Sequence, residues 1–179
     1  MSTADILSAE KRHLAQLIEA VQHCVYFLDA AAGKLPWPLE GEELARQKKD
    51  RDLFGCLAAF NERFAKLQDT LAAAMRHAHL LLGESAESFL QVLAYYEKQG
   101  VIASLADWQL LRTARNLAAH DYETDYVGIA EHFNTLHELM PVLLAASGNF
   151  VCLCRERLAI EPASPDFSDE FKQIIAPLT

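Results

Sequence analysis

The sequence RDLFGCLAAFNERFAKLQDTLAAAMRHAHLLL spans residues 51–82 and contains the clearest structural pattern in the chain. Its apolar positions recur at alternating steps of four and three, at Leu53, Leu57, Phe60, Phe64, Leu67, Leu71, Ala74, Ala78 and Leu81. That spacing places all of them on one face of an α-helix. It predicts a long, packed helix from about Glu42 to Leu82. The helix can also begin as late as Asp50, because residues 46–51 are mostly charged.

Other segments show the same kind of periodicity. Apolar heptad positions predict a first helix from about Ala4 to Ala32, with Leu7, Leu14, Val21 and Leu28 on one face. Ser104 and Asp107 resemble a capping box at the start of a later helix. The expected further helices span about residues 85–98, 105–119 and 126–157. Within them, Leu90 and Leu110 are expected on buried faces.

Together these segments predict one all-α domain, an antiparallel up-down bundle of about four to five helices. A chain of 179 residues can bury such a core without disulfides or metals. The bundle domain is expected over residues 1–160, with a proline-bearing crossover loop at 33–42. Residues 161–179 form a tail, whose short helix at 167–175 has little to bury and is expected to be mobile or docked on a partner. The heptads of the first helix suit either the core or a dimer seam.

Charge and composition exclude several classes of protein. The net charge of −9 argues against a broad DNA or RNA footprint and against adhesion to anionic membranes, although a small basic site is compatible with it. The first residues lack the pattern of a secretory signal, and no apolar run reaches the roughly 18 residues of a membrane span. The spacing of Cys24, Cys56, Cys152 and Cys154 fits neither a zinc site nor a disulfide framework. A cytoplasmic protein with buried thiols is expected.

One segment, RTARNLAAHDY at residues 112–122, combines chemically versatile side chains. On a helix, Trp108, Arg115 and Tyr122 form a stripe about 100° from the apolar one. An aromatic ring, a guanidinium and a phenol on one stripe indicate an interface or a site, and Trp108 suits the core or a dimer interface. His120 lies off this stripe, so either the helix ends before it or a second chain completes the site. A histidine at a helix C-terminus suits proton exchange near neutral pH.

The pattern Arg115-Asn116-x-x-x-His120-x-Tyr122 resembles the Arg-x4-His-x-Tyr signature of HEPN domains. In particular it resembles the HepT-like toxins, which pair with minimal nucleotidyltransferase antitoxins. Upstream, the resemblance includes residues 63–71, Gly100-Val101-Ile102, Trp108 and Leu111-Arg112. It covers about residues 51–144, an HEPN-like core that leaves out the first helix and the tail.

The resemblance implies a homodimeric endoribonuclease without metal or cofactor, in which the arginine and histidine of both chains meet in one cleft. Arg115 would hold the scissile phosphate, which suits a guanidinium fork. His120 would be the general acid/base for the ribose 2′-hydroxyl proton, and Asn116 would orient either residue. Tyr122 matches the tyrosine that the partner nucleotidyltransferase modifies with AMP. The added phosphate would lie beside Arg115 and block RNA.

Two other interpretations stay open. Many members of this group are known only as nucleotidyltransferase substrate-binding proteins, so the chain is alternatively a non-catalytic protein that docks such an enzyme and presents Tyr122 or another substrate to it. A third interpretation is a structural dimeric bundle with a vestigial motif. The basic run at 46–51 suits a solvated helix start or a patch that faces RNA or a partner. Arg63, Lys66 and Arg76 are cations that can approach the motif in space.

Overall fold

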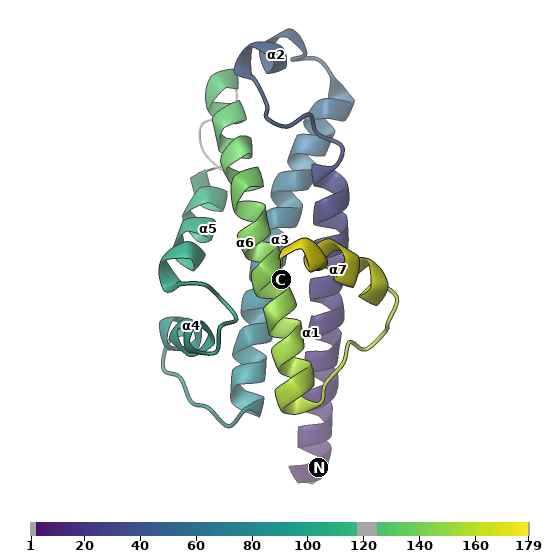
Figure 1. Ribbon diagram of the computed structural model, residues 1–179, viewed down its shortest axis with the longest axis vertical. Helices are drawn as coiled ribbons and strands as arrows, with labels where there is room; N and C mark the ends of the chain where they lie inside the picture. The colour runs from purple at the N-terminus through teal and green to yellow at the C-terminus, as the bar shows by residue number, and fades with distance from the viewer. Residues whose placement is uncertain (1–2, 118–124, 179) are drawn as a thin grey trace.

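The computed structural model describes residues 3–117 and 125–178, and these residues form seven α-helices and one short 3-10 helix. Three long helices, α1 (Thr3–Ala32), α3 (Arg51–Leu81) and α6 (Tyr126–Leu158), follow the long axis, and each contacts the other two (Figure 1). The shorter elements are α2 (Gly41–Arg46), α4 (Phe89–Lys98), α5 (Leu105–Leu117), α7 (Ser168–Ile175) and η1 (Ala176–Leu178). The prediction of an all-α chain is confirmed for the described residues.

The predicted apolar face of α3 lies at the centre of the core. Its residues Phe60, Phe64, Leu67, Leu71, Ala74 and Ala78 are fully buried. α1 packs along α3 and buries Leu14, Val21 and Leu28, so this part of the heptad pattern belongs to the core of the protomer. Leu7 is 48% exposed. Figure 1 shows why, because the N-terminal turns of α1 extend beyond the ends of the neighbouring helices.

The expected helix from Glu42 to Leu82 is divided in two, and this is a correction to the longer version of the prediction. α2 ends at Arg46, and α3 begins only after Asp50. The Asp50 carboxylate accepts hydrogen bonds from the backbone N–H groups of Asp52 and Leu53, both at 2.9 Å. In a continuous helix these two N–H groups would donate to backbone carbonyls four residues earlier, so the N-cap replaces those bonds at the start of α3. The later start at Asp50 was the correct alternative, and α2 adds to the expected number of helices.

α4 and α5 form a second layer beside α3 and α6 (Figure 1). The predicted cap of α5 is confirmed, because Ser104 Oγ accepts from the Asp107 N–H at 3.0 Å and donates to Asp107 Oδ2 at 2.8 Å. The burial of Leu90 and Leu110 was predicted wrongly, since these side chains are 54% and 49% exposed. α5 turns the face with Trp108 inward, so the indole ring is buried in place of the smaller Leu110 side chain. Its expected end near residue 119 lies outside the described residues.

The C-terminal segment docks on the protein's own bundle, which corrects the expectation that it has little to bury. α7 contacts both α1 and α6 and crosses in front of them in Figure 1. Phe171 is only 2% exposed. The ring of Phe167 packs edge-on against His23 of α1, with centroids 5.0 Å apart. Two aromatic side chains in a short amphipathic segment therefore anchor it, each burying a large apolar area.

α6 is long and apolar enough to cross a membrane by length and composition, with a mean hydropathy of 1.4 in its most apolar window. Half of that window is buried inside the bundle. Core helices of soluble proteins have the same composition, and α6 packs on α1, α2, α3, α5 and α7. The described structure is thus compatible with a soluble helical protein.

Acidification is expected to destabilise the fold through His137. Its ring stacks on Trp37 at 4.1 Å with an angle of 9°, and burial lowers its pKa from 6.5 despite the opposing effect of Glu138. The unfolded chain then binds a proton more readily, so stability is present above the unfolded pKa and is lost as the pH falls through the folded one. Urea midpoints at about pH 7.5 and 5.5 test this. His137→Phe keeps a ring on Trp37 but cannot be protonated. Its urea midpoint should therefore fall less between pH 7.5 and 5.5 than that of wild type, and an equal fall would contradict the prediction.

Candidate functional site

Arg115 lies on the side of α5 that faces α3. Its Nη1 donates to Asp69 Oδ1 at 2.5 Å and to the backbone carbonyl of Ala65 at 3.2 Å. The Arg115 side chain is 19% exposed, whereas the Asp69 side chain is 65% exposed. Both partners belong to α3. The charge-assisted hydrogen bond to Asp69 and the bond to the Ala65 carbonyl therefore fix this guanidinium at the α3–α5 junction.

A cleft of about 280 Å³ opens at this junction and gathers three arginines. Arg76 comes from α3, and Arg112 and Arg115 come from consecutive turns of α5. Asp69 is the only acidic residue that lines the cleft within the described part of the chain. Three guanidiniums against one carboxylate leave a local excess of positive charge on a protein whose net charge is −9. Such a cleft attracts an anion, and guanidinium groups match phosphate oxygens in geometry.

Gln68 gives the cleft a buried polar wall. It is 3% exposed, and its Nε2 donates to the Trp108 carbonyl at 3.4 Å. Its Oε1 is buried and has no hydrogen-bond partner among the described residues. A buried acceptor without a partner costs free energy, about 1–3 kcal/mol for a typical group.

The cations that were expected to approach the motif divide between two faces of α3. Arg76 lies in the cleft, where its Cζ is 4.0 Å from the centroid of Phe89. Arg63 faces the opposite way, toward α1, with its Cζ 5.2 Å from the centroid of Phe27. Lys66 is exposed and takes part in neither of these contacts. The expectation therefore holds for Arg76 and fails for Arg63.

The remaining residues singled out from the sequence are partly described. Asn116 is exposed on α5. Trp108 is 4% exposed and lines the cleft, so its ring belongs to the core of the protomer. His120 and Tyr122 lie outside the described residues. The structure brings Arg115 together with Arg76, which was expected to approach the motif, and with Arg112.

Two residues of the cleft, Gln68 and Asp69, lie in the stretch that carries the resemblance, but neither of them was assigned a role from the sequence. A signal for Gln68 was present, because it follows Phe64 by four residues and precedes Leu71 by three, and both are fully buried. A polar residue at such a core-facing position requires a reason. Asp69 carries no comparable signal, since its exposed position on α3 resembles that of any solvated carboxylate.

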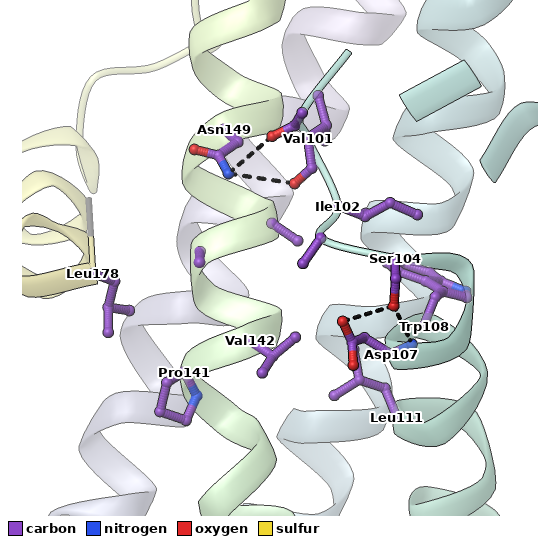
Figure 2. Close-up of a pocket in the computed structure, with 14 residues that line it drawn as sticks. Val101, Ile102, Ser104, Asp107, Trp108, Leu111, Pro141, Val142, Asn149 and Leu178 are labelled. Atoms are coloured by element: carbon purple, nitrogen blue, oxygen red, sulfur yellow. Dashed lines mark hydrogen bonds between the residues drawn. The ribbon is translucent and has the colours of Figure 1, made fainter. Parts of the chain in front are cut away.

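A second cavity, of about 420 Å³, lies between α5, α6 and the C-terminal Leu178. Figure 2 shows that Asn149 Nδ2 donates to the carbonyls of residues 100 and 101, at 3.3 and 3.4 Å, while Ser104 and Asp107 bond to each other. Its polar groups are thus engaged within the protein, and most of the remaining lining is apolar. This cavity has no cation among its lining residues and offers no match for a phosphate.

Among the described residues, no histidine or cysteine lines the cleft. His77 contacts Glu10 of α1, whereas His79 is 4% exposed and packs edge-on against Tyr95, so the two rings point in different directions. Burial raises the pKa of Cys24 and raises that of Cys154 to about 12, as expected for inert thiols. The other two thiols are half-buried.

Comparison with known proteins adds no further assignment. No protein-family model matches the chain, and no significant similarity to a curated protein or a solved structure was found. The residues and geometry of the cleft therefore carry the functional argument.

Proposed function

We propose that the chain is the HepT-like, HEPN-type half of a toxin–antitoxin pair, acting in the cytoplasm as a homodimeric, metal-independent endoribonuclease. The observation that carries this proposal is the cleft in which Arg76, Arg112 and Arg115 converge. In sequence, the last described residue of α5 is followed almost at once by His120 and Tyr122. RNA cleavage without a metal requires cations that hold the phosphate and a group that transfers protons; the arginines of the cleft suit the first role, and His120 is proposed for the second.

Arg115 is suited to hold the scissile phosphate. Only its Nη1 bonds to described residues, so Nε and Nη2 remain to donate to two phosphate oxygens. Asp69 fixes the guanidinium before RNA arrives, which lowers the entropy lost on binding. Negative charge on the phosphate oxygens grows as the 2′-oxygen attacks, and a preorganised cation stabilises that charge.

His120 supplies the proton transfers in this proposal. One imidazole removes the proton of the ribose 2′-hydroxyl while the 2′-oxygen forms a bond to phosphorus. The bond from phosphorus to the 5′-oxygen breaks, and a second imidazole, from the partner subunit in a dimer, protonates that oxygen. The products are a 2′,3′-cyclic phosphate and a 5′-hydroxyl. Asn116, the neighbour of Arg115 in the chain, would orient the arginine or the histidine.

Cleavage of RNA by purified protein in EDTA tests the proposal. Wild type should cleave, and His120→Ala and Arg115→Ala should each lose activity by about 100-fold or more. Arg157→Ala is a matched control, because Arg157 is an exposed arginine at the end of α6. Loss of activity in the control as well, or no cleavage by a folded, unmodified dimer, would contradict the proposal.

The alternative function is a docking protein for a small nucleotidyltransferase. It is favoured by one observation, the ion pair with Asp69, which already neutralises part of the Arg115 charge. This interpretation predicts a stable complex with the nucleotidyltransferase and no cleavage of RNA. It shares with the leading proposal the role of Tyr122 as acceptor.

Transfer of AMP to Tyr122 is expected on co-expression with the cognate nucleotidyltransferase. The phenol oxygen would attack the α-phosphorus of ATP and release pyrophosphate. Intact mass spectrometry should show an AMP adduct on wild type and none on Tyr122→Phe. An adduct that persists in Tyr122→Phe would assign the modification to another residue. The modified protein should also lose RNA cleavage, because the added phosphate competes for the arginine cleft.

A further inference from the structure

A groove of about 550 Å³, distinct from the arginine cleft and from the cavity beside Leu178, lies between α1 and α3. It is on the side of α3 that faces away from Arg115. Its basic side chains come from three places, Lys34 after α1, Arg51 at the start of α3 and Arg63 in its middle. Small residues, Ala30 and Gly55 among them, form part of the lining. The groove is therefore open between the cations, and nothing lies within 4 Å of a Cβ placed on Gly55.

The cations of this groove form no ion pair with the described residues. None of Lys34, Arg51 and Arg63 has a carboxylate within 4.0 Å among the described residues. Asp52 is the single acidic residue of the lining. Like charges that converge on one groove repel one another, and a bound anion relieves that repulsion. The arrangement favours a phosphate-bearing ligand.

An aromatic ring stands beside these cations. Phe27 is 37% exposed, unusually open for a phenylalanine in a packed helix pair, and the Arg63 guanidinium lies 5.2 Å from its centroid. Exposed aromatic rings and guanidinium planes are the surfaces on which unpaired nucleobases stack. The groove thus offers a phosphate contact and a stacking surface close together, which matches one nucleotide of a single strand.

The groove and the arginine cleft share no lining residue, but both are lined by residues of α3. Arg63 lines the groove, and Asp69 of the cleft follows six residues later, which is about 9 Å along the helix axis. Lys66 is exposed and lies halfway between them in sequence and in angle around the helix. A single strand that runs along α3 from one site to the other would pass Lys66, as well as the exposed carboxylates of Glu62 and Asp69.

We propose that the groove of Lys34, Arg51 and Arg63 binds a nucleotide of single-stranded RNA next to the segment held in the arginine cleft. This inference rests on the proposed function for the identity of its ligand. It adds a substrate-binding surface outside the motif, and it explains how an acidic protein holds RNA, through a small basic surface formed by α3 and the residue Lys34 after α1.

Binding of a labelled single-stranded RNA of about 12 nucleotides tests the track, measured by fluorescence anisotropy on the His120→Ala background in EDTA. The double variant Lys34→Gln/Arg51→Gln should raise Kd about tenfold and reduce the salt dependence of log K by about 1.4, as expected for two lost phosphate contacts. The control is Arg155→Gln/Arg157→Gln, a pair of exposed arginines at the C-terminal end of α6. Its Kd and salt dependence should stay unchanged.

Gly55→Leu tests the same groove without removing a charge. Leucine improves the helix by about 1 kcal/mol relative to glycine, so this variant is expected to fold at least as well as wild type. Because its side chain fills the groove, Kd for the RNA should rise about tenfold, the cost of excluding one stacked nucleotide. A thermal melt of the variant establishes that the fold is intact.

The outcomes separate this inference from the proposed function. An unchanged Kd in both groove variants would overturn the track, even if wild type cleaves RNA. Displacement of the RNA by AMP or inorganic phosphate at equal concentration would overturn it too, by assigning the groove to a free nucleotide or phosphate. If wild type does not cleave RNA but the groove variants bind it less tightly, the track stands and only the proposed nuclease fails.

Discussion

Arg115→Lys is expected to lower the rate of RNA cleavage by about 100-fold or more, nearly as far as Arg115→Ala. Lysine keeps the positive charge but cannot bond to Asp69 and the Ala65 carbonyl while also offering two aligned donors to a phosphate. Single-turnover rates in EDTA, measured with saturating protein, report the chemical step without the effect of product release. The effect should appear in the rate constant more than in RNA affinity.

Arg157→Lys is the control for this substitution, since it makes the same change at an exposed site at the end of α6. Its rate should equal that of wild type. If Arg115→Lys cleaves within about threefold of wild type, the cleft needs only a positive charge, and the role assigned to the guanidinium fork is wrong.

Leu71→Ala is expected to destabilise the fold by about 3–5 kcal/mol, because Leu71 is fully buried on the apolar face of α3. The cost combines the lost transfer of a large side chain with the cavity left behind. For a chain of this length, such a change lowers Tm by about 6–20 °C. Urea unfolding and a thermal melt measure it.

Leu80→Ala provides the matched control on the same helix. Leu80 is 67% exposed, so its truncation should change stability by less than about 0.5 kcal/mol. Equal effects of the two substitutions would contradict the account of α3 as the central core helix.

The course of α3 could be predicted from the sequence because its apolar steps repeat without interruption over many turns, and all turns indicate the same face. The break before it could not be predicted with the same ease. The break depends on whether the Asp50 side chain or a preceding helical turn accepts the hydrogen bonds of the Asp52 and Leu53 N–H groups, and in the structure the Asp50 side chain accepts them. On α5, periodicity was wrong for Leu110, and the stripe that begins with Trp108 lies about 100° from the apolar one. Only the packing against α3 decides that Trp108 faces inward and Leu110 outward.

The candidate site shows the same division between local and tertiary information. Arg115 follows from a short motif that can be recognised in the sequence. Asp69 precedes it by 46 residues, and their contact exists only because α3 and α5 pack together. Arg63 and Arg76 lie on one helix, yet they face α1 and α5 respectively. A one-dimensional pattern lists these cations as equivalent, and the fold assigns them to different sites.

The most direct test of the central claim is the identity of the RNA ends produced in EDTA by purified wild-type protein. The account predicts 2′,3′-cyclic phosphate and 5′-hydroxyl ends, no cleavage of an RNA whose 2′-hydroxyls are methylated, and no cleavage of the unmodified RNA by His120→Ala. Intact RNA after incubation with folded, unmodified wild-type dimer would contradict the account, as would cleavage that His120→Ala retains.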